Sequence, residues 1–581
     1  MRLNEDLKWH SYSSGWLLHV MIDTGLASTT FVPNPSAWHI WIDPAYPQGA
    51  INVYPAAEGG LVHTFPHMEA NEPPRPKWPC RRGKLCLVTP QSVFARLGDR
   101  REPSDANERL FWHLQRAVSW VSAAASNTLL QPGDPFELPR FVQEDERPLT
   151  VAHQENARTF GLWQKTNPTW GIATLAPAAD RADLLAIKEF LDEAWRPLVT
   201  YTWGDAVGHV DTAWAAWLRL PDLPVLPPWK APRTWAQLVQ TCATLGLDWA
   251  EMIDQMAWMG RRRPVDLLLL GFPVSGRVGE APTQLTWQAI RLPRIGGDTA
   301  APQGFRPNRY GRRQQVHLAF APGATITWQP TYNWDAAVLG ARGRYAEPVR
   351  TSRALLIGVG AVGAPLGEML VRGGMQDLDL VDPDRLEAGN LVRHTLALMQ
   401  VRASKASALA SRLGRLAPFA RVRAFPVALP TVRPALARVL TESDLVIDCT
   451  AEDEVLATLS TYADGRIRRY VSISVGWQAR RLYFFFALGK CFPADAFAIA
   501  YAPWAEREAV DQAKCGCAAD APGCWHPLFP ARYDATILLV AAAAQMIERA
   551  CTGALAAGLH VLECRTDANG LPGLRQVTAQ G

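Results

Sequence analysis

The feature that most constrains the fold is an apolar run that leads directly into a glycine-rich turn. Residues 354–358 read ALLIG, and Gly358, Gly360 and Gly363 have the spacing G-x-G-x-x-G. A continuous apolar run is typical of a parallel strand that is buried on both faces. Glycines here permit a tight turn and let phosphate approach the backbone, and the helix expected over 364–371 directs its N-terminus at the anion. The order of strand, turn, helix and strand predicts a doubly wound α/β domain.

The next predicted strand places a carboxylate where a nucleotide sugar can reach it. Residues 377–382 read DLDLVD, and Asp382 follows Gly363 by about twenty residues, the spacing at which an acidic residue accepts hydrogen bonds from ribose hydroxyl groups. These residues fit NAD as well as ATP. They therefore predict a nucleotide site without naming the nucleotide.

The polar residues that follow distinguish between the two nucleotides. Asp384, Asn390, Arg393 and Lys405 come after Asp382. Hydride transfer has no use for amide and basic groups that converge on phosphates, but adenylate transfer needs them to neutralise the charge of the departing pyrophosphate. Taken alone, an arginine or a lysine at these positions is a solvated surface charge. In this order the residues favour ATP.

The segment DPDRLEAGNLVR (382–393), with Lys405 downstream, resembles the ThiF, MoeB and ubiquitin-activating-enzyme superfamily, whose pattern is D-x-D-x-[LV]-x-x-x-N-L-x-R. The resemblance implies a Rossmann-like adenylation domain that binds ATP. It implies that Asp382 holds the ribose, with Asp384 in the same nucleotide site. Asn390, Arg393 and Lys405 would hold or neutralise the ATP phosphates.

One later segment departs from the superfamily pattern. Where the family usually reads D-C-T-D-N, this chain reads Asp448-Cys-Thr-Ala451-Glu452-Asp453. An alanine cannot bind a metal ion, whereas Mg²⁺ prefers carboxylate oxygens. We expect Asp448 to belong to the nucleotide site and to be the Mg²⁺ ligand, with Glu452 or Asp453 as alternatives.

Adenylation creates a good leaving group that a thiolate can displace, so a nucleophilic cysteine is expected after the nucleotide site. We favour Cys524, because GCWHPLFPARYDAT lies on a predicted loop that leads into the apolar helix 536–547. This loop is similar to the crossover loop of conjugating members of the superfamily. The spacing of Cys515 and Cys517 lacks the paired C-x-x-C of a common zinc site, but zinc there stays an alternative. The remaining candidates are Cys491, Cys551 and Cys564.

A second nucleophile is predicted near the N-terminus. KWPCRRGKLCLVTP resembles the active-site segment of ubiquitin-conjugating enzymes, in which a proline-rich crossing precedes G-x-[IL]-C-L and the cysteine carries the thioester. The matching residue is Cys86, although the usual His-Pro-Asn element is not clear. Cys80 is the rival nucleophile but lacks this setting. His63 and His67 lie upstream and are expected to be structural.

Composition sets the broad class. The chain has 581 residues, 48% of them hydrophobic and 20% charged, with a net charge of +4 and ten cysteines. These values indicate a multidomain globular protein rather than a disordered or nucleic-acid-binding one. The apolar stretch 536–547 is too short to cross a bilayer, and the first residues lack the apolar core of a secretory signal. We therefore expect a cytoplasmic protein with free thiols and no membrane or nucleic-acid partner.

Three domains are predicted. Residues 1–150 form a ubiquitin-conjugating-like α+β domain, 151–345 a linker domain and 346–581 the ThiF-type adenylation domain. Apolar periodicity and turn signals also predict individual elements. The expected strands are 38–43, 49–55 and 267–274, and the expected helices are 108–128 and 234–245.

This domain order resembles the fused activating and conjugating protein of bacterial type II CBASS antiphage operons. The resemblance implies that the C-terminus of a cGAS-like nucleotidyltransferase is adenylated, passed to Cys524, then to Cys86, and joined to an unknown amine, in a homodimer. An adenylyltransferase for a sulfur-carrier protein is the first alternative, but it leaves the segment around Cys86 without a role. The others are an inactive nucleotide-binding scaffold and an NAD-linked oxidoreductase.

Overall fold

The computed structural model describes most of the chain. The described residues are 1–87, 102–142, 145–211, 213–249, 265–295, 318, 320–429, 434–515, 530–566 and 568–578. They form two compact units. The first comprises Met1–Leu175, Glu189–Thr200 and Thr212–Tyr332, and the second comprises Ala176–Lys188, Tyr201–Asp211 and Asn333–Gly581.

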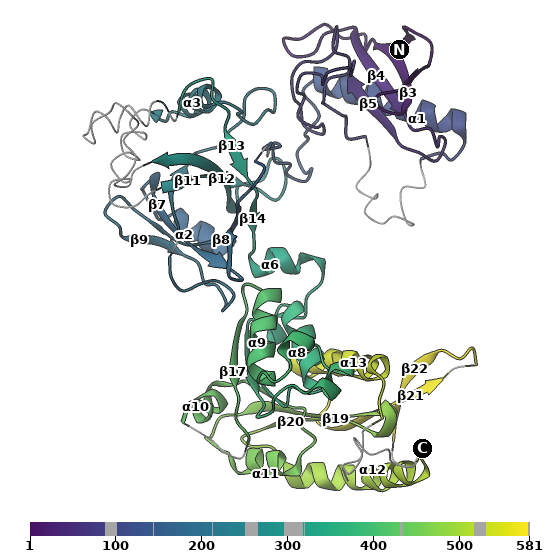
Figure 1. Cartoon of the computed structure of the whole chain (residues 1–581), viewed down its shortest axis with the longest axis vertical. Coiled ribbons are helices and arrows are strands. Elements are labelled where there is room, and N and C mark those ends of the chain that lie inside the picture. The colour runs from purple at the N-terminus through teal and green to yellow at the C-terminus, as the bar shows by residue number, and fades with distance from the viewer. Residues whose placement is uncertain are drawn as a thin grey trace. The chain divides into compact units, whose positions relative to one another are not determined.

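The N-terminal part is an antiparallel sheet with one long helix packed on it (Figure 1). The strands run in the order β1-β3-β4-β5, with β2 also paired to β3. Alternate residues of β4, such as Trp38 and Ile40, are buried between the sheet and α1. The elements are β1 (Arg2–Leu3), β2 (Lys8–His10), β3 (Gly15–Ile22), β4 (Ser36–Ile42), β5 (Ile51–Pro55) and α1 (Ala106–Ala125).

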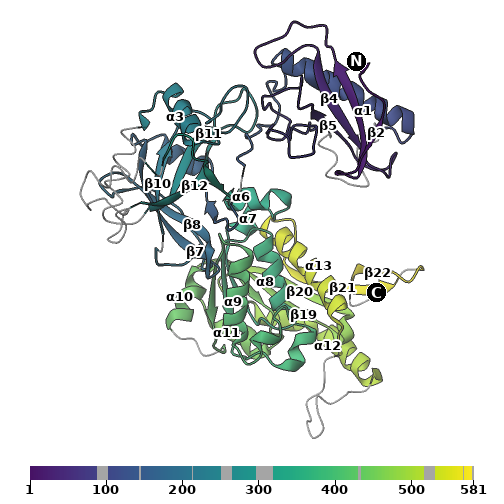
Figure 2. The same ribbon diagram turned by 45° about the horizontal axis from the view of Figure 1, so that its top comes forward.

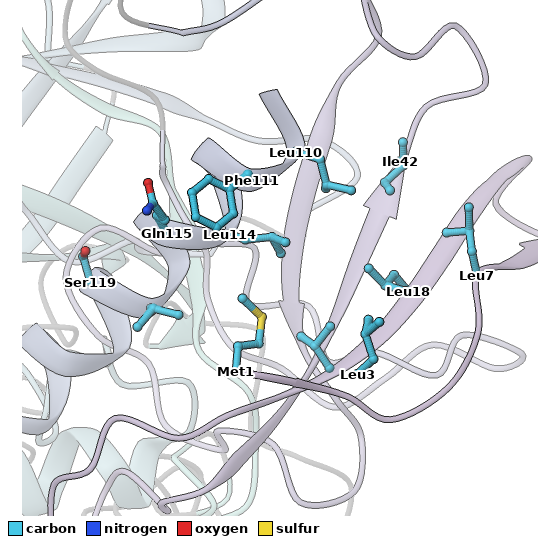
Figure 3. A pocket seen from close by; sticks show the side chains of 12 residues that line it. Met1, Leu3, Leu7, Leu18, Ile42, Leu110, Phe111, Leu114, Gln115 and Ser119 are labelled. Atoms are coloured by element: carbon cyan, nitrogen blue, oxygen red, sulfur yellow. The ribbon is translucent and has the colours of Figure 1, made fainter. Parts of the chain in front are cut away.

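This sheet and α1 leave an apolar groove of about 910 Å³ along one edge (Figure 3). Leu18 and Ile42 come from the sheet, and Leu110 and Phe111 come from the first turns of the helix. Met1 contributes its side chain from the N-terminal residues, which form one rim of the groove. The N-terminal segment therefore only partly covers the apolar edge of this core.

The middle part is built on a mixed nine-stranded sheet. The strand order is β13-β12-β11-β10-β7-β8-β6-β14, with β9 paired to β8. Tryptophans fill much of its core, and Trp217, Trp287 and Trp328 are at most 1% exposed. The elements are β6 (Thr150–His153), α2 (Ala157–Trp163), β7 (Trp170–Ala178), β8 (Arg181–Leu191), β9 (Pro197–Thr200), β10 (Ala213–Arg219), α3 (Trp235–Thr244), β11 (Val265–Val274), β12 (Gln284–Ile295), β13 (Thr327–Gln329) and β14 (Thr331–Asn333).

The C-terminal part is a three-layer α/β domain. Its eight strands run in the order β17-β16-β15-β18-β19-β20-β21-β22, parallel from β17 to β19 and antiparallel beyond. The elements are α6 (Ala336–Leu339), η2 (Gly340–Arg342), α7 (Glu347–Arg350), β15 (Arg353–Ile357), α8 (Gly363–Arg372), β16 (Asp377–Val381), η3 (Ala388–Val392), η4 (Leu398–Gln400), α9 (Lys405–Leu416), β17 (Arg421–Phe425), α10 (Pro434–Glu442), β18 (Leu445–Asp448), α11 (Asp453–Thr461), β19 (Arg468–Val475), η5 (Trp477–Ala479), β20 (Arg481–Gly489), α12 (Ala494–Cys515), α13 (Tyr533–Cys551), β21 (Gly558–Thr566) and β22 (Pro572–Val577).

Alternate residues of the central strands face two helix layers. Leu356 packs in the cluster that contains α8, α9 and α13, whereas Leu355 and Ile357 pack in the cluster that contains α10 and α11. Figure 1 shows these layers on opposite faces of the sheet, and both views show the hairpin β21–β22 extending beyond them (Figure 2). The chain runs outward from β15 in both directions, so a topological switch point lies at β15. In such sheets ligands bind at the carboxyl ends of the strands beside that point.

The predicted fold class and the elements around the nucleotide loop are confirmed. The expected strand 354–358 is β15, and the expected helix 364–371 is α8. The helix expected over 108–128 is α1, which starts at Ala106 because Asp105 caps its N-terminus by accepting two backbone N–H groups. None of the helices in the described part of the chain has the length and apolar character that a bilayer crossing requires.

A loop of the middle sequence belongs to the second unit and packs against the adenylation domain. The Gly204 N–H donates to Pro418 O at 2.8 Å, and the Val422 N–H donates to Asp205 Oδ2 at 3.1 Å. A Cβ atom on Gly204 would lie 1.9 Å from the carbonyl oxygen of Ala420. The contact therefore requires glycine at position 204.

We predict that Gly204→Ala separates this loop from β17, because backbone atoms cannot yield to a 1.9 Å approach. Hydrogen–deuterium exchange at residues 418–422 should become faster. Gly208→Ala is the matched control, because its nearest neighbour would lie at 3.4 Å, an ordinary contact. Equal exchange in both variants would contradict the docking.

Candidate functional site

The glycine loop lies at the carboxyl end of β15. Gly358 has φ of +79°, a conformation that glycine adopts without strain. A Cβ atom on Gly363 would lie 1.9 Å from Gly358 O, so the start of α8 packs directly on the loop backbone. Gly360 differs, because a Cβ atom there would meet no protein atom within 4 Å. Packing does not demand glycine at position 360, and the open space beside it suits a phosphate group.

Asp382 fixes the loop from the neighbouring strand end. Its carboxylate is 5% exposed and accepts the Val359 N–H at 2.8 Å on one oxygen and the Asp384 N–H at 2.8 Å on the other. A carboxylate has further acceptor sites on each oxygen, so these bonds are compatible with a ribose contact. The role of Asp382 toward ribose stays a prediction, and its observed contacts hold the loop.

His394 holds the other side of the same loop residue. Its Nε2 lies 2.7 Å from Val359 O, and its Nδ1 accepts the Leu396 N–H at 3.1 Å. Because a carbonyl can only accept, the proton must be on Nε2, and the ring is neutral. Burial lowers the pKa of His394 and so favours this neutral form. The backbone of Val359 is thus held by Asp382 at its N–H and by His394 at its carbonyl.

The basic and amide groups lie on the segment between β16 and α9. Lys405 is the first residue of α9, and its Nζ lies 2.8 Å from Asp384 Oδ2. The lysine side chain is 11% exposed and that of the aspartate 63%. Asn390 uses its side-chain oxygen to accept the Glu387 N–H at 3.0 Å, and its remaining polar group is the amide NH₂, a donor. Arg393 directly follows the 3₁₀ helix η3 and is partly buried.

Asp448 ends β18 beside the loop and is 1% exposed. Burial raises its pKa, while hydrogen bonds from Thr450 and Ser472 oppose this change. One oxygen accepts the Thr450 N–H at 3.0 Å and its hydroxyl at 2.6 Å, and the other accepts the Ser472 hydroxyl at 3.0 Å. These bonds shape the turn, whereas Glu452 and Asp453 are exposed. No group of three or more His, Cys, Asp or Glu side chains in the described ranges is arranged to hold a metal ion.

Cys86 is far in sequence from the glycine loop and lies in an extended segment of the N-terminal part. Its N–H donates to His67 O at 2.8 Å, and Leu85 forms a β-bridge with Met68. Leu85 and Met68 are buried, so alternation along the segment turns Cys86 to the other face, where it is exposed. A thiol that accepts a protein acyl group must be accessible in this way.

The other cysteines differ from Cys86 in exposure. Cys80 is 0% exposed, and burial raises the pKa of its thiol far above the usual value. Burial also raises the pKa of the Cys551 thiol. Cys515 is the last residue of α12, whereas Cys517 and Cys524 lie outside the described residues. The geometry therefore supports Cys86 over Cys80 and does not test Cys524.

Comparison with known proteins decides the family. A protein of Enterobacter hormaechei subsp. hoffmannii, the ATP-dependent ubiquitin transferase-like protein Cap2, is 32% identical to the chain over 541 residues. The aligned part covers 92% of this chain and 89% of that protein. The chain belongs to the Cap2 family.

Further matches agree with the Cap2 family. The family model of the Cap2 central linker domain matches residues 127–334, and that of the ThiF family matches residues 332–475. The predicted boundaries at 150 and 345 stay predictions. A sulfur carrier protein adenylyltransferase of Thermus thermophilus is 35% identical over 105 residues, which cover 18% of this chain and 38% of that protein.

One solved structure is a more distant likeness. In a crystal structure of E. coli MccB with AMPCPP and MccA, the matched part covers 48% of this chain and 73% of the MccB chain, at 12% sequence identity. The TM-score is 0.29, so this likeness does not bear on the site. The Cap2 family and the ThiF match identify the chain as an enzyme of the ATP-dependent adenylyltransferase class.

Sequence reasoning missed some residues that build the site. His394, Thr450 and Ser472 hold the loop and the neighbouring turn, but none was assigned a role from the sequence. His394 does lie directly after the segment 382–393, which is the signal that could have indicated it. Its function depends on burial and on a contact 35 positions back in the chain.

We predict that ATP binding weakens as pH falls through the lowered pKa of His394, which lies below the usual value of 6.5. Burial lowers the pKa of His394, so the ring stays neutral in the folded protein at ordinary pH, and its hold on the loop is lost only as pH falls through this lowered pKa. Protonation removes the acceptor for the Leu396 N–H. In His394→Gln the amide can still donate to Val359 O but does not titrate.

The measurement is the ratio of ATP affinities of the parent and His394→Gln by calorimetry from about pH 5 to about pH 8. The titration of ATP itself cancels in this ratio. The parent should lose affinity on acidification more steeply than the variant. Parallel curves would show that His394 does not control the loop.

Proposed function

We propose that this enzyme activates a protein C-terminus and passes it through two cysteines to an amine. The terminal carboxylate attacks the α-phosphate of ATP and forms an acyl adenylate with release of pyrophosphate. The Cys524 thiolate displaces AMP, the Cys86 thiolate displaces Cys524, and the acceptor amine displaces Cys86 to form an amide. The observation that carries the proposal is the 92% coverage by a ubiquitin transferase-like relative, which includes both the nucleotide loop and the segment of Cys86.

The residues beside the loop fit ATP. Open space at Gly360 and the N-terminus of α8 suit the phosphates. Lys405 is held by Asp384, whose carboxylate is exposed, so that water screens the attraction between the two groups. The phosphates of ATP carry more negative charge than one carboxylate, so the ammonium group of Lys405 can exchange its contact with Asp384 for a contact with phosphate. Asp384 therefore keeps Lys405 oriented before ATP binds.

We further propose that Mg²⁺ accompanies ATP. Asp448 is the ligand expected from the sequence, but its oxygens accept bonds from Thr450 and Ser472. The exposed Glu452 and Asp453 are the alternatives on the same turn. Mg²⁺ takes many of its ligands from phosphates and water, so one carboxylate suffices.

The proposed setting is a bacterial type II CBASS antiphage system. The activated protein is a cGAS-like nucleotidyltransferase, and the enzyme acts as a homodimer through its adenylation domains. The resemblance of the sequence to fused activating and conjugating proteins supports this. A sulfur-carrier adenylyltransferase is less consistent, because the match to such an enzyme covers only 18% of the chain.

We predict that Lys405→Ala slows substrate-dependent exchange of pyrophosphate into ATP by about 100-fold, because one preorganised charge contact stabilises the transition state by a few kcal/mol. Lys490→Ala, an exposed lysine of the same domain, is the matched control. EDTA in the same assay tests the Mg²⁺ dependence. Exchange at the parental rate in Lys405→Ala would refute the phosphate contact.

We predict that the two cysteine variants accumulate different species. Cys524→Ala should form the acyl adenylate and release pyrophosphate but form no thioester, whereas Cys86→Ala should retain a reductant-sensitive adduct on Cys524 and form no conjugate. Mass spectrometry locates each adduct, and Cys564→Ala serves as the control. An adduct on Cys80, Cys515 or Cys517 would overturn the assignment of nucleophiles, and full conjugation by Cys86→Ala would remove the role of the N-terminal part.

A further inference from the structure

An ion pair lies directly behind the backbone of Cys86. The carbonyl of His67 accepts the Cys86 N–H at 2.8 Å. The imidazole Nδ1 of His67 lies 2.7 Å from Glu137 Oε2, and its Nε2 lies 3.2 Å from Leu129 O. The residue that orients the amide of Cys86 is therefore held at both ring nitrogens.

The partners of His67 require both ring nitrogens to be protonated. A carbonyl and a carboxylate accept hydrogen bonds, so each nitrogen must donate, and only the imidazolium form does this. The hydrogen bond to Glu137 raises the pKa of His67 in agreement with this geometry. His67 also has φ of +57°, a region that costs non-glycine residues about 1 kcal/mol or more. The ion pair stabilises a strained backbone beside the proposed nucleophile.

The partners of His67 belong to the segment after α1, which the Cap2 linker model includes. The Gly133 N–H donates to Val278 O at 2.9 Å, and Pro135 forms a β-bridge with Arg277. The turn between β11 and β12 thus holds the segment that carries Glu137. A continuous series of contacts runs from the middle sheet to the amide of Cys86.

We propose that the His67–Glu137 ion pair is a positioning device that holds the backbone of Cys86 for acyl transfer. This inference rests on the proposed role of Cys86. Other charged groups face the same region: Asp134 acts on His67 from the Glu137 segment, and Glu69 pairs with Lys84 at 3.2 Å and with Arg140 at 3.8 Å. None of these charged groups replaces the two N–H groups that the His67 imidazolium donates to Glu137 and to Leu129 O. Because the folded pKa of His67 is raised, its contribution is fully present below about pH 6.5 and is lost as pH rises through the folded pKa.

The test compares Glu137→Gln with the parent in the full chain, with a cGAS-like nucleotidyltransferase as substrate. The rate of thioester formation on Cys86 should fall about tenfold at about pH 6, because a displaced nucleophile loses its alignment. The ratio of the two rates should approach one at about pH 9, where the parent has lost its imidazolium. Glu137→Asp should restore part of the rate, and Glu58→Gln makes the same chemical change at an exposed site of the N-terminal part.

A second measurement is independent of turnover. NMR of ¹⁵N-histidine-labelled protein, with the His67 signal assigned from His67→Asn, should show a pKa above the usual value in the parent and a lower one in Glu137→Gln. A parent that never forms a thioester on Cys86 would refute the proposed function itself. A parent that forms it, with a rate ratio independent of pH or an ordinary His67 pKa, would overturn the positioning role alone.

Discussion

The nucleotide site depends on the contact between Gly358 and Gly363. The carbonyl of Gly358 lies where a Cβ atom of residue 363 would be, so α8 can start only at a glycine. This brings the N-terminus of α8 against the carboxyl end of β15, where its free N–H groups and dipole favour an anion. Asp382 and His394 then fix Val359 between the two glycines. Without the close approach at Gly363, neither side chain would meet the loop in this geometry.

The middle sequence contacts the adenylation domain and the segment behind Cys86 without supplying a reacting group. Within the second unit, the loop around Gly204 packs where α9, whose first residue is Lys405, leads into β17. Within the first unit, Glu137 pairs with His67 behind Cys86. A domain expected from its sequence only to link two others thus supports the backbone of each.

The sequence predicted the parts of the fold that local patterns control. The apolar run 354–358 and the glycine spacing identified β15 and α8, and alternating residues identified β4 and β5, because these signals depend on neighbours in the chain. The contacts of His394 and Glu137 could not be predicted, since they join residues 35 and 70 positions apart and depend on tertiary packing. Cys86 was predicted from a short local motif and stays a prediction. The contact of His67 with the backbone of Cys86 was not predicted, because the sequence around a histidine does not indicate which residue it will contact.

The turn after β18 has an alanine in a left-handed conformation, at the position where the superfamily pattern has an aspartate. Ala451 has φ of +59°, a conformation that asparagine and aspartate adopt more readily than alanine. The bonds from Thr450 to Asp448 hold the turn in this conformation although the side chain is a methyl group. Asp448 is needed for these bonds and is buried, so its movement toward a cation would disrupt the turn. If Mg²⁺ accompanies ATP as proposed, it would therefore take most of its ligands from phosphate and water, and the basic groups around Lys405 would neutralise the remaining phosphate charge.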